Sequence, residues 1–78
     1  MEELKTMTFN YDNLKKLIIS KYGYGNLQRL ADDVKMAYIT LWRKLNNQSF
    51  FNNEEILKLS KVLHIDNKDI AFYFLKLS

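Results

Sequence analysis

The chain of 78 residues contains no cysteine and no proline, and it has only two glycines and one histidine. Without cysteine it has no disulfide framework, no thiol nucleophile and no zinc site of the usual Cys/His type. The single histidine, His64, could bind a metal only with carboxylates beside it. No metal-ligand spacing, Gly-rich phosphate loop or nucleophile motif occurs in the sequence. We therefore expect a protein that is not an enzyme and that uses no metal and no cofactor.

Long apolar runs are missing as well. No apolar stretch approaches the roughly twenty residues that cross a bilayer, and the first eleven residues lack the layout of a signal peptide. We expect a cytoplasmic protein with no membrane partner. A chain of this size holds one small core, so the sequence predicts a single domain over residues 1–78 and makes a partner subunit a reasonable expectation.

Positive charge is small in total but uneven along the chain. Twelve Lys and Arg residues against nine Asp and Glu residues give a net charge of +3. Residues 1–20 and 49–78 are each neutral, so the whole excess lies in residues 21–48. An imbalance of this size also arises by chance. If the protein contacts a polyanion, this middle segment is where the contact is expected.

Four segments carry apolar residues at the three- and four-residue spacing of one helical face: residues 14–22, 27–34, 37–45 and 54–65. Residues that can cap a helix precede three of them: Asn10 or Asp12, Asn26, and Asn52 or Asn53. Gly23 is placed to end the first helix in a left-handed conformation. Glu54 and Glu55 fall in the first turn of the last helix, where carboxylates suit the positive end of the helix dipole.

The two ends of the chain have a different pattern. Residues 6–11 alternate polar and apolar, which is the period of a half-buried strand. Residues 70–77 are aromatic-rich and fit either a short helix or a strand; we favour one or two helical turns at residues 68–72 followed by a strand. The predicted fold is a mainly α, compact domain of four to five helices with short N- and C-terminal β-strands, which could pair with each other or across a dimer.

The most informative segment is residues 27–45. The small residue Ala31 is followed by apolar residues three, five, ten and fourteen positions later: Val34, Met36, Leu41 and Leu45. Two short helices that cross closely need this pattern, because the small residue leaves room for the second helix and the apolar residues anchor the turn. The spacing resembles the helix-turn-helix of the phage repressor and Cro family. The resemblance covers residues 14–65, and the ending Leu45-Asn46-Asn47 is similar to small phage-encoded members.

Two positions depart from the family pattern. The family's usual Gly in the turn is Lys35 here, which would cost about 1 kcal/mol in a left-handed conformation. The Gln that commonly opens the second helix and touches a phosphate is replaced by Leu27, with Gln28 one residue later.

The resemblance implies that residues 37–45 form a recognition helix that reads DNA bases. The candidate base contacts are Tyr38, Ile39, Thr40, Trp42 and Arg43. Arg43 can pair with a guanine edge, and Ile39 and Thr40 can meet a thymine methyl group. The candidate phosphate contacts around this helix are Gln28, Arg29, Lys35, Lys44, Asn46, Asn47 and Gln48. Trp42 could instead be half-buried against the first or fourth helix, and each polar residue could be an ordinary solvated side chain.

The resemblance also implies a function: a sequence-specific double-stranded DNA-binding transcriptional regulator, most plausibly a small phage or prophage Cro-like repressor that acts as a dimer. Residues 70–77 hold the candidate dimer contacts, because they are more apolar than one small core can bury: Phe72, Tyr73, Phe74, Leu75 and Leu77. A second interpretation is a protein-interaction module on the same fold, an antirepressor or inhibitor that docks a protein through Tyr38, Ile39 and Trp42.

Overall fold

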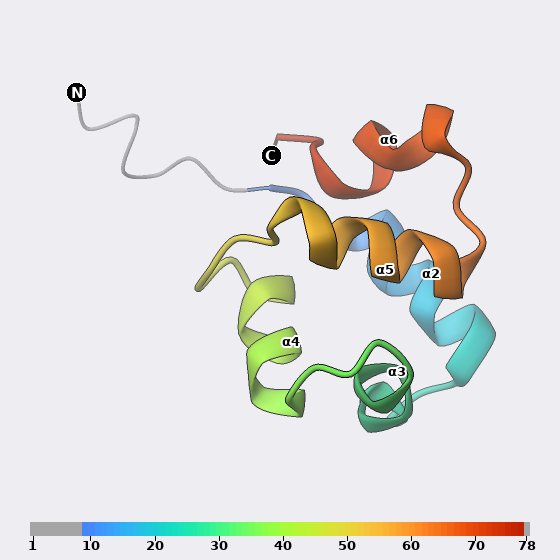
Figure 1. Cartoon of the computed structure of the whole chain (residues 1–78), viewed down its shortest axis with the longest axis vertical. Coiled ribbons are helices and arrows are strands. Elements are labelled where there is room, and N and C mark those ends of the chain that lie inside the picture. The colour runs from blue at the N-terminus through green and yellow to red at the C-terminus, as the bar shows by residue number, and fades with distance from the viewer. Residues whose placement is uncertain (1–8, 78) are drawn as a thin grey trace.

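A computed structural model describes residues 9–77 of the chain. These residues form five α-helices and one short 3-10 helix: α2 (Asp12–Tyr22), α3 (Leu27–Asp33), α4 (Tyr38–Leu45), α5 (Asn53–Leu63), η1 (Asn67–Asp69) and α6 (Ile70–Phe74) (Figure 1). The prediction of a compact, mainly α domain with four to five helices is confirmed. None of these helices combines the length and the apolar character that a membrane span requires.

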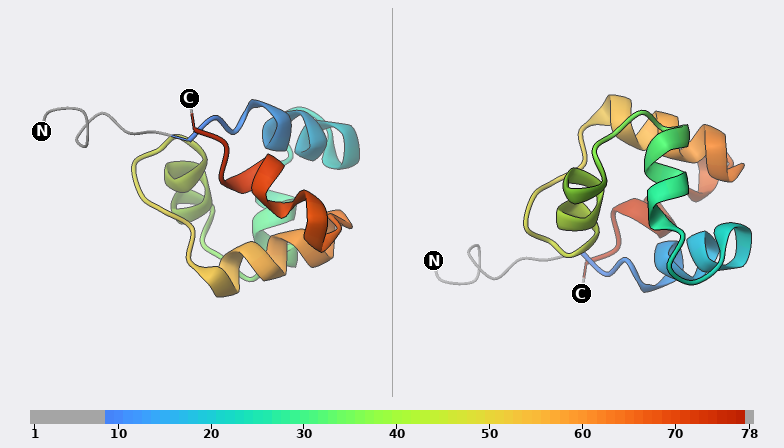
Figure 2. Two further views of the ribbon diagram at one scale, coloured as in Figure 1. Left: turned by 90° about the horizontal axis from the view of Figure 1, so that it is seen from above. Right: turned by 90° about the horizontal axis from the view of Figure 1, so that it is seen from below.

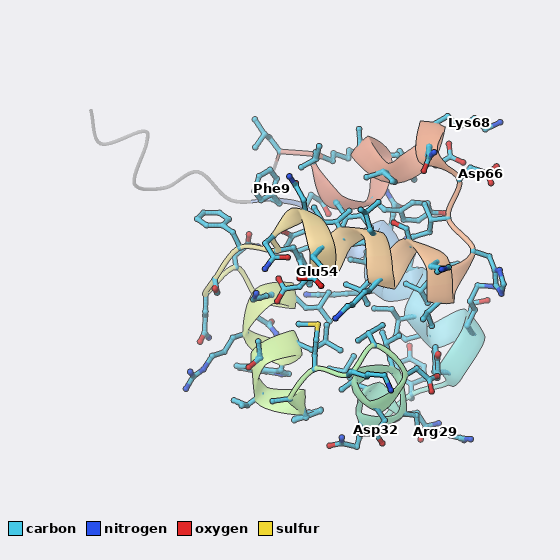
Figure 3. The ribbon with its side chains drawn as sticks, viewed as in Figure 1. Phe9, Arg29, Asp32, Glu54, Asp66 and Lys68 are labelled. Carbon is cyan, nitrogen blue, oxygen red and sulfur yellow. The ribbon has the colours of Figure 1, made fainter. Side chains whose placement is uncertain are left out.

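The helices enclose one apolar core. α2 packs against α3, α5 and α6, and α3 packs against α4. In Figure 1, α5 lies in front of α2, with α6 above this pair and α3 and α4 below it. Side chains from all five helices fill the interior (Figure 3), among them four leucines with no exposed surface: Leu14, Leu30, Leu41 and Leu59. Each fully buried leucine contributes roughly 1.5–3 kcal/mol to folding, so the predicted helical faces are the ones that form the core.

The helix ends follow the sequence prediction only in part. α5 begins with a capping box, in which Asn52 Oδ1 accepts from the Glu55 N–H and Glu55 Oε1 accepts from the Asn52 N–H. Asn26 precedes α3 as predicted, but its side chain does not cap that helix. Its Nδ2 instead donates to the carbonyl of Tyr22, at the end of α2. Gly23 follows α2 as predicted and has a positive φ of 89°, which a residue with a side chain adopts only with strain. Its ψ of 166° places it outside the left-handed helical conformation that the sequence predicted.

The predicted end strands are wrong within residues 9–77. Phe9 and Leu77 form one isolated antiparallel bridge, and the Asn10 N–H donates to the carbonyl of Lys76 at 2.6 Å. Figure 2 shows the two ends of the described chain side by side. Helix α6 continues to Phe74 because a helical position places that ring in the core, where it is 1% exposed. Burial therefore outweighs the strand preference of the aromatic residues. Residues 6–8 of the predicted N-terminal strand lie outside the described part of the chain.

Candidate functional site

Helix α4 presents two different faces. Leu41 and Leu45 are buried, whereas Tyr38, Ile39 and Arg43 are exposed on the outer side. The helix begins after Ala37, which is extended (φ −64°, ψ 140°). In Figure 1, α3 is seen end-on while α4 runs along the plane of the view, so the two helices cross. α4 is thus held by its inner face and leaves its outer face open.

The turn between α3 and α4 is tightly held. Ala31 is fully buried, and its carbonyl accepts from the Met36 N–H at 2.9 Å. Lys35 has a φ of 57°, the left-handed conformation expected for this position. For a residue other than glycine, the left-handed conformation costs roughly 1–2 kcal/mol. The burial of Ala31 and Val34 in the core stabilises the turn and offsets that cost.

The predicted base-contact residues lie mostly on the open face of α4. Ile39 is 49% exposed and Tyr38 is 42% exposed, whereas Thr40 is half-buried. Trp42 is 39% exposed and lines a shallow groove with Tyr24 and residues of α2. Its ring therefore lies at an accessible surface beside the first helix, and it is more exposed than the half-buried position of the alternative interpretation.

Five of the predicted phosphate contacts are exposed: Gln28, Arg29, Lys35, Asn46 and Gln48. Two of them already bond within the protein. Gln28 Nε2 donates to Asp32 Oδ1 at 2.8 Å, and Asn46 Nδ2 donates to the carbonyl of Trp42 at 2.8 Å. Arg29 and Lys35 are the exposed cations of this group.

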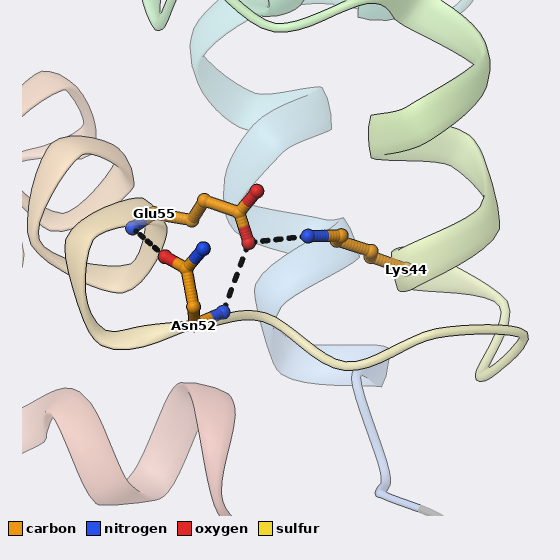
Figure 4. Close-up of polar contacts among 3 residues, drawn as sticks. All are labelled: Lys44, Asn52 and Glu55. Atoms are coloured by element: carbon orange, nitrogen blue, oxygen red, sulfur yellow. Dashed lines mark hydrogen bonds and ion pairs between the residues drawn. The ribbon is translucent and has the colours of Figure 1, made fainter.

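Lys44 was predicted to contact phosphate, and the structure corrects this expectation. Its Nζ lies 2.5 Å from Glu55 Oε1, the same oxygen that accepts from the Asn52 N–H (Figure 4). The Lys44 side chain is only 11% exposed. Burial raises the pKa of Glu55, but the hydrogen bonds from Lys44 and Asn52 outweigh it and hold that pKa below its ordinary value. Lys44 therefore joins α4 to α5 and does not reach outward.

Asn47 was also predicted to contact phosphate, but its side chain holds the N-terminal segment. Its Oδ1 accepts from the Phe9 N–H, and its Nδ2 donates to the Phe9 carbonyl, both at 2.9 Å. The carboxamide satisfies both backbone groups of Phe9, as a neighbouring strand would. Each polar atom of the carboxamide thus bonds to Phe9, and the predicted phosphate contact of Asn47 stays a prediction.

The predicted dimer contacts separate into two groups. Phe74 is buried against Phe51, with the ring centroids 5.6 Å apart, and Tyr73 is half-buried. Both belong to the interior of one chain, and Phe74 is therefore excluded as a surface contact. Phe72, Leu75 and Leu77 are each about half exposed, and Leu75 and Leu77 line an apolar groove with Phe9 and Phe50.

A hydrogen bond between α2 and α3 has no signal in the sequence pattern. The Tyr22 hydroxyl donates to Asp33 Oδ2 at 2.5 Å, and this bond raises the pKa of Tyr22 to about 12. Lys58 and Lys61 of α5, which were not among the predicted site residues, lie with Lys35 around one hollow. Their three-residue spacing on one helical face was the available signal, but only the fold shows that this face adjoins the α3–α4 turn.

The arrangement defines a class: a small helical domain in which one short helix, fixed by its neighbours, exposes a mixed apolar and cationic face. The chain belongs to the family described as protein of unknown function (DUF739), whose model matches residues 7–77. No curated protein matches the chain.

Proposed function

We propose that the protein is a sequence-specific double-stranded DNA-binding regulator of transcription, a small Cro-like repressor of phage or prophage type that binds as a dimer and blocks access to a promoter. The observation that carries this proposal is the open face of α4. Arg43, Tyr38 and Ile39 project from a helix whose inner residues are fully buried. At about 1.5 Å per residue, this eight-residue helix is about 12 Å long, which suits entry into a major groove.

Arg43 is the residue best suited to base recognition. The ion pairs within residues 9–77 are Lys44–Glu55 and Lys58–Glu54, so no carboxylate in this part of the chain holds the Arg43 guanidinium. An arginine can donate two hydrogen bonds to the O6 and N7 atoms of guanine. Ile39 beside it supplies an apolar contact for a thymine methyl group, and Arg29 and Lys35 supply charge for phosphates.

The C-terminal segment supports the dimer part of the proposal. At the Phe9–Leu77 bridge, Asn47 occupies the outer backbone groups of Phe9. No backbone hydrogen bond within residues 9–77 uses the N–H of Leu77, and Leu75 and Leu77 are exposed beside it. Among residues 9–77, one edge of the paired ends is thus occupied by Asn47, and no backbone group bonds to the other edge. An open edge flanked by apolar side chains suits antiparallel pairing with a second copy about a two-fold axis.

Selection of binding sites from a random pool of DNA duplexes tests the proposal most directly. We expect enrichment of one sequence with two inverted half-sites about one helical turn apart, because a two-fold dimer presents two α4 faces. Titration of the selected duplex in a gel-shift assay then gives the affinity. No enrichment and no shift at micromolar protein would overturn the proposal.

The apolar character of the α4 face favours a second candidate, a protein-interaction module such as an antirepressor or inhibitor. Tyr38, Ile39 and Trp42 together form an accessible apolar surface. The salt dependence of the binding affinity distinguishes the DNA-binding regulator from the protein-interaction module. Binding through several phosphates weakens by orders of magnitude between 50 and 200 mM salt, on the scale of about 10³–10⁵ for six to ten contacts. An apolar protein interface changes little over this range.

A further inference from the structure

A charged hollow lies between the α3–α4 turn and α5. It is lined by three lysines, one carboxylate and two valines: Lys35, Lys58, Lys61, Asp33, Val34 and Val62. All three lysines are exposed. Lys35 comes from the turn, whereas Lys58 and Lys61 come from consecutive turns of α5, so the set is assembled only by the fold.

The residues that line this hollow carry an excess of positive charge. Among the described residues, the lining has one carboxylate, Asp33, against three lysines, so two positive charges remain in excess; Asp33 also accepts a hydrogen bond from the Tyr22 hydroxyl. Lys58 has an acidic neighbour on its own helix, but Nζ and Glu54 Oε2 are 3.9 Å apart and both side chains are largely exposed. Exposed pairs of this kind contribute at most a few tenths of a kcal/mol. The hollow therefore attracts anions, although residues 49–78 are neutral as a segment.

The apolar part of the hollow determines where the charges lie. Val34 is buried and Val62 is half-buried, so they form a floor that the aliphatic stems of lysines can cover. Lysine stems pack on such surfaces while their ammonium groups remain in water. Lysine stems packed in this way would leave three ammonium groups around one concave surface, where a polyanion with spaced charges can meet them together.

We propose that this hollow is a second phosphate-binding surface, which contacts the backbone of the duplex beside the segment facing α4. The inference rests on the proposed DNA-binding function. Lys35 joins the two surfaces, because it lies three residues before Tyr38, the first residue of α4. A phosphate backbone supplies regularly spaced negative charges and no base information. This matches a hollow that residues 9–77 line with three lysines against one carboxylate and with no aromatic or amide side chain.

The test is the salt dependence of binding by the double variant Lys58→Gln, Lys61→Gln. Each lost phosphate contact lowers the slope of log K against log salt by about 0.9 on B-form DNA. We expect a slope smaller by about 2 and an affinity roughly tenfold weaker per lysine at 0.1 M salt. The preference for the selected sequence over a mutated one should stay unchanged, because phosphate contacts carry no base information.

Lys68→Gln is the matched control. Lys68 is also an exposed lysine, but Figure 3 places it beside α6, at the far end of the molecule from Arg29 and Asp32 on α3. It should leave the slope unchanged. If the wild type binds DNA and the double variant has the slope of Lys68→Gln, the hollow is not a phosphate surface. If the wild type binds no duplex, the proposed function fails first, so the two failures are distinguishable. Thermal melts of both variants confirm that each remains folded.

Discussion

The Nζ of Lys44, near the end of α4, lies 2.5 Å from Oε1 of Glu55, in the first turn of α5. The same carboxylate oxygen closes the capping box of α5 by accepting from the Asn52 N–H. One side chain therefore starts α5 and ties it to the helix that carries the candidate DNA surface. This contact fixes the direction of α4 without using its outer face.

The first prediction concerns this carboxylate. Glu55→Gln keeps an oxygen that can accept from Asn52 but loses the charge that attracts Lys44. Because both side chains are largely shielded from water, we expect the free energy of unfolding to fall by about 1 kcal/mol. Glu54→Gln, at the exposed neighbouring position, should change it by at most a few tenths. Urea unfolding at neutral pH measures both variants.

The pH dependence of the same pair has a definite sign. Glu55 has a lower pKa in the folded state than its ordinary value of 4.5. Its stabilising contribution is therefore complete above that value and is lost as the pH falls through the lower folded pKa. The stability difference between wild type and Glu55→Gln should shrink on acidification below about pH 4.5. A difference that stays constant down to acid unfolding would contradict the ion pair.

The second prediction uses the Tyr22–Asp33 hydrogen bond. Its donor has a folded pKa of about 12 against an ordinary value of 10. Because this pKa is raised, the stabilisation is complete below pH 10 and is lost as the pH rises toward 12. Tyr22→Phe should lower the free energy of unfolding at neutral pH by up to about 1 kcal/mol. It should also flatten the decline in stability between pH 10 and 12. Tyr24→Phe, at an exposed position, is the control and should do neither.

The third prediction concerns a hydroxyl in the core. Ser60 is 6% exposed, and its Oγ has no hydrogen-bond partner within the described residues. A buried polar atom without a partner costs about 1–3 kcal/mol. We expect Ser60→Ala to raise the free energy of unfolding by about 1 kcal/mol, whereas Ser20→Ala at the exposed end of α2 should change it little. A loss of stability in Ser60→Ala would show that the hydroxyl is bonded in solution.

The sequence predicted the helices and their buried faces because apolar spacing is a local property. It did not predict the contacts of Lys44 and Asn47, because their partners lie 11 and 38 residues away along the chain. It did not predict the burial of Phe74, because that depends on the shape of the core. The hollow lined by Lys35, Lys58 and Lys61 was not predicted for the same reason. A count of charge along the chain treats Lys58 and Lys61 as part of a neutral segment, whereas the fold places them beside Lys35.

The fourth prediction tests the proposed dimer edge. Leu75 is 52% exposed and lines the groove beside the open edge at Leu77. Leu75→Glu would place a charge in the pairing surface, so sedimentation at tens of micromolar should change from a dimer to a monomer. Leu57→Glu alters an equally exposed leucine on α5 that does not line this groove, and it should leave the dimer intact. A wild type that is monomeric both alone and on DNA would disprove the dimer.

The fifth prediction compares the two arginines of the chain. Arg43 lies on the open face of α4, and Arg29 lies on the exposed side of α3. Arg43→Ala should reduce discrimination between the selected duplex and one with a mutated base pair by roughly 1–3 kcal/mol, with no change in melting temperature.

Arg29→Ala should weaken binding to both duplexes equally and lower the salt slope by about 1, because a phosphate contact carries no base information. Gel-shift titrations on the two duplexes, repeated at several salt concentrations, separate the two roles. Unaltered discrimination in Arg43→Ala would remove α4 as the reading helix. Loss of discrimination in Arg29→Ala alone would move base recognition to α3. Because both side chains are exposed and outside the core, we expect both variants to remain folded, which thermal melts check.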